Sequence, residues 1–485
     1  MTTQSMPSNS RRQVRNFVII WVVVTLIMGA CTFIAIYTAY GALNDRAQQV
    51  NVLPPTVTAI PQAAVVNATP IPTRQIANPP TNTPPPTPVV VAQAATVVGA
   101  ATATDAPPPT PAPTILPVND KLYQVGIQVQ VSPDFNPDNQ DLWMGAVADQ
   151  LHMKWIKQQV RWEDIERERG NYDWAQLDFS LPIAAERGIH VMLSIVTAPE
   201  WAREPGVDTS KHGPPANPQD YATFVSEILK RYPGMVHAVE IWNEMNLDRE
   251  WTSINGLNAN DYVTLLRTTY QAVKAIDPGV IVISGALSPT GGWTEPDGRV
   301  SAIDDFSYFD GLIAGGMLSY ADCVGAHHNG INMNPNETWD TVTNDPTASF
   351  RGPFDNKHHS WSFRSTLQTY ANKIQVAGSD LRLCVTEFGW ASTEDLDGTP
   401  PGFEFANDNT LDEQKQWTID AVNNMEQWGI VWLAFLWNLN YGPQAGWDPN
   451  NDNVPYSIIG KDWQFRPVYD AIGQWQLDYQ ARTGQ

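Results

Sequence analysis

Short apolar runs alternate with amphipathic segments from Lys121 to the end of the chain. The apolar runs have the length of buried strands, and the segments between them carry apolar side chains at helical spacing. The strands predicted from these runs are 124–131, 155–160, 190–195, 236–241, 280–284, 323–326, 381–386 and 431–437. The pattern therefore predicts strands and helices in regular alternation.

Boundary signals support the helices that this pattern predicts. Asn217 followed by Pro218 is typical of an N-cap and a first helical residue. Residues 262–276 carry apolar side chains on one face, as expected of a helix that packs on a sheet. Thr410 and Glu413 form a capping box ahead of a further amphipathic helix.

Strand–helix alternation over residues 119–485 indicates an α/β domain with a parallel sheet covered by helices. Eight repeats favour a closed (β/α)8 TIM barrel over an open doubly wound sheet. No G-x-G-x-x-G follows a predicted strand and no G-x-x-x-x-G-K-[ST] occurs, so the main sequence motifs of a dinucleotide-binding site and of a P-loop are missing. We therefore predict one (β/α)8 domain over 119–485.

An uncharged apolar stretch, residues 17–40, follows three arginines in the segment 1–16. Its length is enough to span a bilayer as a helix. The arginines favour a cytoplasmic N-terminus, so 1–16 is predicted to be a short cytoplasmic tail and the later chain extracellular. A cleaved signal peptide and a lipoprotein processed at Cys31 are the alternatives, and each also exports the domain.

Residues 41–118 connect the predicted transmembrane helix to the domain. The part from 51 to 118 holds 17 prolines, repeated Thr-Pro pairs and almost no charge. Such a composition cannot build a core and favours extended, polyproline-like chain. We predict a disordered Pro/Thr-rich stalk that holds the domain away from the membrane.

The chain carries a formal net charge of −22 at pH 7. A surface of this sign repels phosphate backbones, which argues against a nucleic-acid partner. The three cysteines show no C-x-x-C metal spacing. Cys323 and Cys384 each fall in a predicted strand, so we expect buried free thiols in preference to a disulfide.

Polar residues collect where several predicted strands end, which is where a (β/α)8 barrel carries its functional side chains. The strand 236–241 runs into Trp242-Asn243-Glu244, and the strand 381–386 runs into Glu387. Two carboxylates are therefore expected to face each other across the barrel mouth. Glycoside hydrolysis needs such a pair, one protonated to donate to the leaving oxygen and one ionised to attack the anomeric carbon or to activate water.

These two strand-end motifs resemble those of clan A of the retaining glycoside hydrolases. Trp-Asn-Glu ends the fourth predicted strand and Thr-Glu-Phe-Gly ends the seventh. Within the clan, Glu-Ile-Trp-Asn-Glu-Met-Asn-Leu at 240–247, followed by Trp251, is most similar to glycoside hydrolase family 39, with family 5 as the near rival. The resemblance extends over residues 123–479.

The resemblance implies a role for five residues. Glu244 would be the general acid/base and Glu387 the nucleophile. Asn243 would bind the sugar 2-hydroxyl, and Trp437 would form the sugar platform at the innermost subsite. His327 matches a histidine that lines the site after the sixth strand of these enzymes.

Three positions depart from the family pattern. Met245 follows the acid/base where the family often has Pro. The clan's arginine near the nucleophile is matched here by Lys157, with Arg161 as a possible substitute. The clan's His-x-Tyr motif, whose Tyr bonds the nucleophile, reads His327-His328-Asn329 in this chain. These changes bear on the hydrogen-bond partners of the nucleophile and leave both carboxylates in place.

Further candidates for sugar binding lie beside the strand ends. Trp201 and Trp251 are expected to stack on sugar rings, with an ordinary core role as the alternative. The long segments 329–359, 388–409 and 438–465 are predicted to wall a cleft or pocket around the carboxylates.

Histidines do not indicate a metal site in the sequence. His327 and His328 have no third ligand at a spacing typical of metal sites, so we expect them to form hydrogen bonds and not to bind a metal. His358 and His359 are predicted to be a solvated loop pair. No metal and no cofactor is therefore expected.

We predict a single-pass membrane protein whose extracellular barrel hydrolyses the β-glycosidic bonds of an oligo- or polysaccharide with retention. A carbohydrate is the expected partner, and the chain is assumed to be a monomer. The alternative is a surface glycan-binding protein that uses the same barrel without turnover.

Overall fold

The computed structural model describes residues 122–133 and 135–484. The predicted tail, transmembrane helix and stalk (1–16, 17–40 and 41–118) lie outside the described residues. Within the described residues, no helix is both long enough and apolar enough to cross a bilayer.

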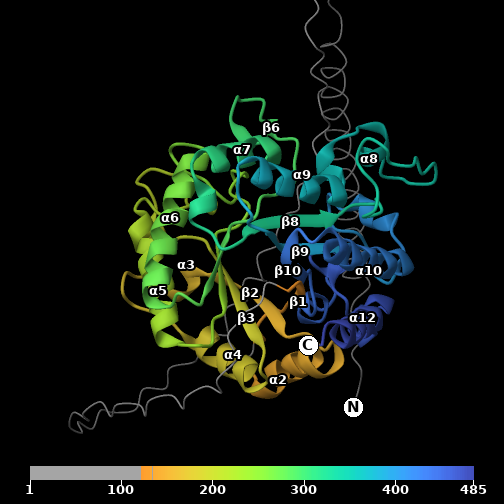
Figure 1. The fold of residues 1–485 in the computed structure, drawn as a ribbon, viewed down its shortest axis with the longest axis horizontal. Helices are drawn as coiled ribbons and strands as arrows, with labels where there is room; N and C mark the ends of the chain where they lie inside the picture. The colour runs from red at the N-terminus through yellow and green to blue at the C-terminus, as the bar shows by residue number, and fades with distance from the viewer. Residues whose placement is uncertain (1–121, 134, 485) are drawn as a thin grey trace, which may run out of the picture. The chain divides into compact units, whose positions relative to one another are not determined.

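Eight parallel strands form the central sheet, in the order β5-β4-β3-β2-β1-β10-β9-β8 (Figure 1). The strands are β1 (Gln124–Gln128), β2 (Trp155–Arg161), β3 (His190–Val196), β4 (Ala238–Ile241), β5 (Ile281–Ser284), β8 (Val324–Gly330), β9 (Leu383–Trp390) and β10 (Val431–Leu436). Each predicted strand corresponds to one of these eight. The predicted α/β class and strand order along the chain are confirmed.

The two edge strands of this sheet approach each other and nearly close a barrel. Ile283 of β5 forms a parallel bridge with Cys323, which precedes β8. The amide of Ser284 donates to the carbonyl of Cys323 at 3.3 Å, and the Ser284 hydroxyl accepts from the amide of Gly325 at 3.0 Å. The predicted (β/α)8 barrel is therefore present, and its seam lies between β5 and β8.

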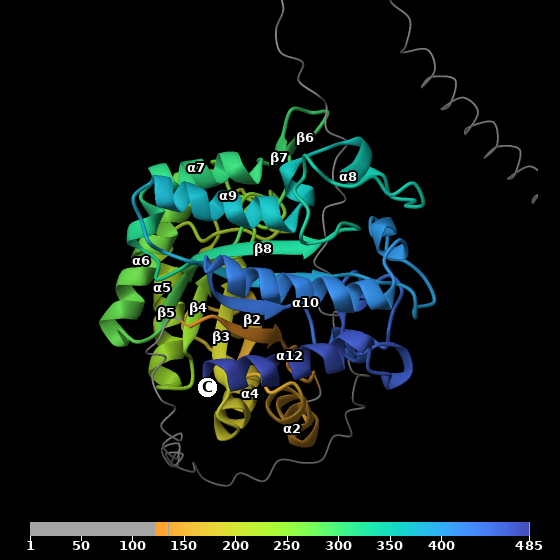
Figure 2. The same ribbon diagram turned by 45° about the vertical axis from the view of Figure 1, so that its right-hand side comes forward.

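Helices cover the outer face of the strands (Figures 1 and 2). The α-helices of the described residues are α2 (Pro137–Gly145), α3 (Trp162–Ile165), α4 (Ala175–Glu186), α5 (Pro218–Arg231), α6 (Ala259–Ile276), α7 (Asp305–Ala314), α8 (Gly352–Asp355), α9 (Phe363–Val376), α10 (Leu411–Trp428), α11 (Tyr441–Gln444) and α12 (Pro467–Thr483). Figure 2 shows α9 and α10 lying alongside β8 and β9. The main hydrophobic core lies between these helices and the strands.

The predicted helix starts agree with the observed caps. The Asn217 side chain accepts from the amide of Gln219 at the start of α5. Thr410 and Glu413 form both bonds of the capping box at the start of α10. A two-stranded hairpin, β6 (Trp293–Thr294) and β7 (Val300–Ala302), was not predicted, because its strands are too short to give a periodic signal.

Inside the barrel the side chains form layers, because alternate residues of a strand point to the same face. A hydrophobic layer includes Trp155, Ala238 and Cys384. Two residues further along the same strands, the corresponding positions are Lys157, Glu240 and Thr386, which are all buried. The barrel interior therefore changes from apolar to charged toward the carboxyl ends of its strands.

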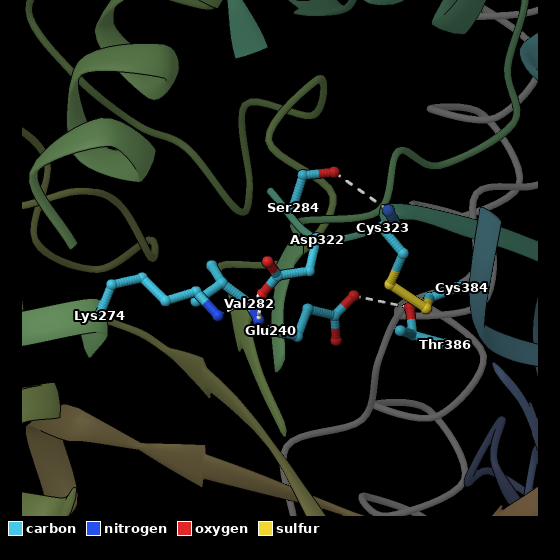
Figure 3. Close-up of a disulfide and its surroundings, with 9 residues drawn as sticks. Glu240, Lys274, Val282, Ser284, Asp322, Cys323, Cys384 and Thr386 are labelled. Atoms are coloured by element: carbon cyan, nitrogen blue, oxygen red, sulfur yellow. Dashed lines mark hydrogen bonds and ion pairs between the residues drawn. A yellow bond between two sulfur atoms is a disulfide. The ribbon is translucent and has the colours of Figure 1, made fainter. Parts of the chain in front are cut away.

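Cys323 and Cys384 form a disulfide, so the expectation of two free thiols is wrong (Figure 3). Strands β8 and β9 are direct neighbours, and Gly325 pairs with Cys384 in their register. This pairing leaves the Cα atoms of the two cysteines 5.8 Å apart, within the range that a disulfide spans. Cys384 lies in β9 as predicted and Cys323 directly precedes β8, and the fact that these two strands are neighbours decided the pairing.

Candidate functional site

Glu244 lies three residues beyond the end of β4, on backbone of unusual conformation. Trp242 and Glu244 have φ angles of 73° and 44°, in the left-handed region that is uncommon for residues other than glycine. The amide of Glu244 donates to the carbonyl of Ala286 at 2.8 Å, which fixes this turn against the segment after β5. Strained backbone of this kind is often found at functional sites.

The Glu244 carboxyl is held by one histidine and one arginine. Its Oε1 lies 3.3 Å from His327 Nδ1, and its Oε2 accepts from Arg249 Nη2 at 3.1 Å. Burial raises the pKa of Glu244, but the hydrogen bond with His327 and the charge of Arg249 outweigh it, so the pKa lies below its usual value. Arg249 had not been singled out in the sequence, because nothing in its spacing distinguishes it from a surface arginine.

Glu387 lies within β9, where the strand extends past the predicted end. Lys157 Nζ is 3.0 Å from Glu387 Oε1, and Asn329 Nδ2 donates to Glu387 Oε2 at 3.2 Å. A buried ammonium and an amide donor both favour the ionised carboxylate. Lys157 and Asn329 thus stand beside this carboxylate where the resembled family has Arg and Tyr.

His327 joins the two carboxylates. It is the direct register partner of Glu387 across β8 and β9. Its Nδ1 lies 3.3 Å from Glu244 Oε1, while its Nε2 lies 3.9 Å from Glu387 Oε1. A single imidazole ring therefore separates the carboxyls of the fourth and seventh barrel strands.

Glu240 is a third buried carboxylate in this network, and the sequence reasoning missed it as a functional residue. Its Oε2 lies 3.6 Å from Lys157 Nζ, and its Oε1 accepts from the Thr386 hydroxyl at 2.6 Å. Figure 3 shows Glu240 and Thr386 bonded to each other beside the disulfide. The available signal was a carboxylate within the strand, two residues after Ala238 and so on the same, inward face.

Asn243 is buried and its side-chain amide has no hydrogen-bond partner within the described residues. Buried amide groups are normally hydrogen-bonded, so this side chain can bond a polar ligand. Asn243 directly precedes Glu244, so this unbonded amide lies next to the candidate acid/base. This observation fits the sugar contact that the family resemblance implies.

Trp437 follows β10 and lies close to the charged network. Lys157 Nζ is 5.7 Å from the centroid of its ring, and the ring of Tyr441 is 5.1 Å away. The Tyr441 hydroxyl in turn accepts from Gln128 Nε2 at 3.0 Å, at the end of β1. The predicted platform residue is therefore brought to the same end of the barrel as Glu387.

Three other candidates are placed elsewhere. Trp251 is 1% exposed and packs edge-on against Trp242 and Tyr262, which is the core role that the sequence left open as the alternative to stacking on sugar. Trp201 packs against Trp162 and beneath Arg169.

The indole of Trp201 donates to the carbonyl of Glu166 at 2.8 Å, which ties it to the β2–α4 connection. Arg161 pairs with Glu163 and lies 3.0 Å from His212. Lys157 contacts Glu387 directly.

The histidines expected to be solvated are largely covered. The side chains of His358 and His359 are 26% and 12% exposed and lie near Asp304 and Asp305, so the prediction of a solvated loop pair is wrong. His358, His359 and Asp304 also group their ligand atoms closely enough to hold a metal ion.

No family model and no curated protein matches the sequence. Solved structures do match the fold. A GH39 enzyme from Xanthomonas axonopodis pv. citri superposes with a TM-score of 0.50 at 16% identity, covering 74% of this chain and 67% of that one. A monomeric beta-xylosidase from Caulobacter crescentus CB15 gives 0.50 at 16% identity, with coverages of 74% and 68%.

A GH5_18 variant from Bifidobacterium longum subsp. longum ATCC 55813, solved in complex with Manb1-4GlcNAc, gives a TM-score of 0.51 at 13% identity. The match covers 74% of this chain and 79% of that one. The chain spans about two thirds of the length of the family 39 and beta-xylosidase structures that it matches. The two families are those that the sequence motifs resemble, and at these identities the likeness is one of fold. The chain therefore has the (β/α)8 barrel fold found in glycoside hydrolases of families 39 and 5.

Proposed function

We propose that the barrel is a glycoside hydrolase that cleaves β-glycosidic bonds of an oligo- or polysaccharide with retention of configuration. The observation that carries the proposal is the arrangement of Glu244 and Glu387 on either side of His327, at the carboxyl ends of β4 and β9. Paired carboxyls in this position are what a double displacement needs. The fold shared with families 39 and 5 agrees with this assignment.

In the first step, the Glu387 carboxylate attacks the anomeric carbon. Glu244 gives its proton to the glycosidic oxygen as the bond between that oxygen and the anomeric carbon breaks, and the sugar is left as an ester of Glu387. Lys157 and Asn329 support this role, because both donate to Glu387 and so favour the ionised nucleophile.

In the second step, the Glu244 carboxylate takes a proton from a water molecule. The oxygen of that water attacks the anomeric carbon as its proton leaves, and the ester bond to Glu387 breaks. The sugar is released with its original configuration. The hydrogen bond with His327 and the charge of Arg249 favour the ionised Glu244 that this step needs, whereas the negative charge of Glu387 favours the protonated Glu244 that the first step needs.

We assign the contact with the sugar to Asn243 and Trp437. The amide of Asn243 has no partner within the described residues, and a sugar hydroxyl supplies both a donor and an acceptor. An indole face such as that of Trp437 packs well on the apolar C–H face of a pyranose.

A trapping experiment tests the mechanism. The full chain, incubated with 2-fluoro glycosides of xylose, glucose and mannose, is expected to gain the mass of one sugar on the peptide that contains Glu387. Glu387→Gln should lose turnover by about three orders of magnitude or more on any glycoside that the wild type cleaves. Glu404→Gln, an exposed carboxylate in the loop after the same strand, serves as the matched control.

Undiminished turnover by Glu387→Gln would remove this residue from the mechanism. Binding of polysaccharide without release of any product by the wild type would instead establish a glycan-binding protein. The anomeric configuration of the first product, followed by NMR, distinguishes retention from inversion.

We further propose that the domain is exported and is held at the cell membrane by residues 17–40, with 41–118 as its stalk. The disulfide between Cys323 and Cys384 supports export, because disulfides persist in oxidising compartments and are rare in the cytosol. Protease added to intact cells should release the barrel into the medium. Retention of the barrel in cells that remain intact would contradict this location.

A further inference from the structure

A second group of chemically reactive side chains lies outside the carboxylate network. Asp304 caps the N-terminus of α7, where its Oδ1 accepts from the amide of Ser307 at 2.8 Å. His358 and His359 come from the end of the long segment between β8 and α9. The segments that carry them follow β5 and β8, so the group lies at the same end of the barrel as Glu244 and Glu387.

The three side chains converge. Asp304 Oδ2 lies 3.7 Å from His358 Nε2 and 3.6 Å from His359 Nε2. One ligand atom from each residue lies within 4.8 Å of the other two. Ligands about 2.1 Å from a tetrahedral zinc ion are roughly 3.4 Å apart. The two carboxylate contacts are within a few tenths of an ångström of that spacing.

Neighbouring groups hold both imidazoles in place. The ring of His359 stacks on Phe306, with centroids 3.5 Å apart. His358 Nδ1 lies 2.9 Å from the Ser360 hydroxyl, which directs Nε2 toward Asp304. This bonding of the far ring nitrogen is what orients metal-binding histidines.

Asp305 is the buried partner behind the group. Its Oδ1 lies 2.9 Å from His359 Nε2 and accepts from the amide of Thr290 at 3.0 Å. Its Oδ2 accepts from the Tyr370 hydroxyl at 2.6 Å. Asp305 therefore adds a second fixed negative charge within reach of an ion bound to His359.

We propose that Asp304, His358 and His359 form a binding site for a divalent transition metal of the zinc type. Two imidazole nitrogens and one carboxylate oxygen are the ligands that such ions prefer, and they do not suit calcium or magnesium. The ion takes the place of the hydrogen bond between His359 Nε2 and Asp305 Oδ1. A water molecule or Asp305 Oδ1 completes the coordination.

The ion would connect two segments that are distant in sequence. It ties the end of the β8–α9 segment to the start of α7, at the end of the barrel that carries the carboxylates. The role is therefore structural: the bound ion stabilises the folded state, in which alone the three ligands meet.

Cobalt binding tests the site directly. The untagged full chain in detergent, freed of metal by a chelator, is titrated with Co²⁺ and followed by its visible d–d absorption. One equivalent is expected to bind, and Zn²⁺ is expected to displace it. Asp304→Asn retains a side chain that caps α7, and His358→Gln and His359→Gln retain polar side chains of similar reach; each should weaken Co²⁺ binding at least tenfold.

A matched control is His152→Asn, since His152 has a φ of 52° that Asn tolerates and lies far along the chain from the group. Zn²⁺ should raise the thermal midpoint of the wild type and of His152→Asn but not that of Asp304→Asn. The metal-free midpoints of all variants report whether each is folded. No saturable Co²⁺ binding by the wild type, or equal binding by the wild type and all three ligand variants, would overturn the proposal.

Discussion

Lys157 Nζ lies 3.6 Å from Glu240 Oε2, and both side chains are completely buried in the barrel. The same ammonium lies 3.0 Å from Glu387, so one lysine is shared by two carboxylates. An arginine presents a planar fork that can bond two carboxylates at once, whereas a lysine is a point charge whose position depends on its partners. Glu240 is therefore one of the groups that position this lysine, together with the carbonyl of Thr386, which accepts from Nζ at 3.2 Å.

Replacing Lys157 is expected to affect stability and the pH profile together. Lys157→Met leaves buried carboxylates without their cation, which should cost about 3 to 5 kcal/mol in the free energy of unfolding. Because ionised Glu387 loses its counter-charge, the acid limb of kcat/KM should move to higher pH. Lys157→Arg keeps the charge and should restore most of the stability. Equal pH profiles for the wild type and Lys157→Met would show that the lysine does not act on the nucleophile.

Glu240→Gln should shift the same limb in the opposite direction. Gln retains an acceptor for the Thr386 hydroxyl but removes the negative charge that balances Lys157. The ammonium then stabilises ionised Glu387 more strongly, so the acid limb of kcat/KM should move to lower pH while kcat falls about tenfold. Thr386→Val, which removes only the hydrogen bond, is the matched comparison. A purely structural role for Glu240 predicts lower stability with no movement of the limb.

Arg249→Gln is expected to move the alkaline limb of the pH profile. The guanidinium favours ionised Glu244, since it helps to lower the pKa of that carboxyl. Without it the pKa of Glu244 should rise, so the proton needed for the first step is retained to higher pH. Activity at neutral pH should then increase relative to the acidic optimum. Arg482→Gln, which removes the partner of Glu426 on α10, should leave both limbs in place.

Loss of the disulfide should lower the stability of the barrel. Cys323 and Cys384 enclose a loop with a sequence separation of 61 residues, for which the free energy of unfolding should fall by about 4 kcal/mol in the double Cys→Ala variant. Guanidinium unfolding of the wild type and the variant measures this difference. Cys31→Ser is the control, and a dithiol reductant should destabilise the wild type without affecting the double variant.

Local sequence signals predicted the barrel well, because each of them acts over a few residues. Alternation of apolar runs and amphipathic segments marked all eight strands, and caps such as Thr410–Glu413 marked helix starts. The strand-end carboxylates Glu244 and Glu387 were found in the same way, since a (β/α)8 barrel brings the carboxyl ends of its strands together whatever their sequence.

Contacts between strands were decided only by the tertiary structure. The bonding of Lys157 to both Glu240 and Glu387 depends on which strands are opposite each other and which residues point inward. Neighbouring strands likewise paired Cys323 with Cys384, while packing enclosed Trp251 and brought His358 and His359 to Asp304. Such relationships join residues far apart in the chain, and no local pattern encodes them. The sequence by itself determined the fold and where its two carboxylates would lie; the tertiary structure decided which charges surround them, because electrostatic partners are set by distance in space and not by distance along the chain.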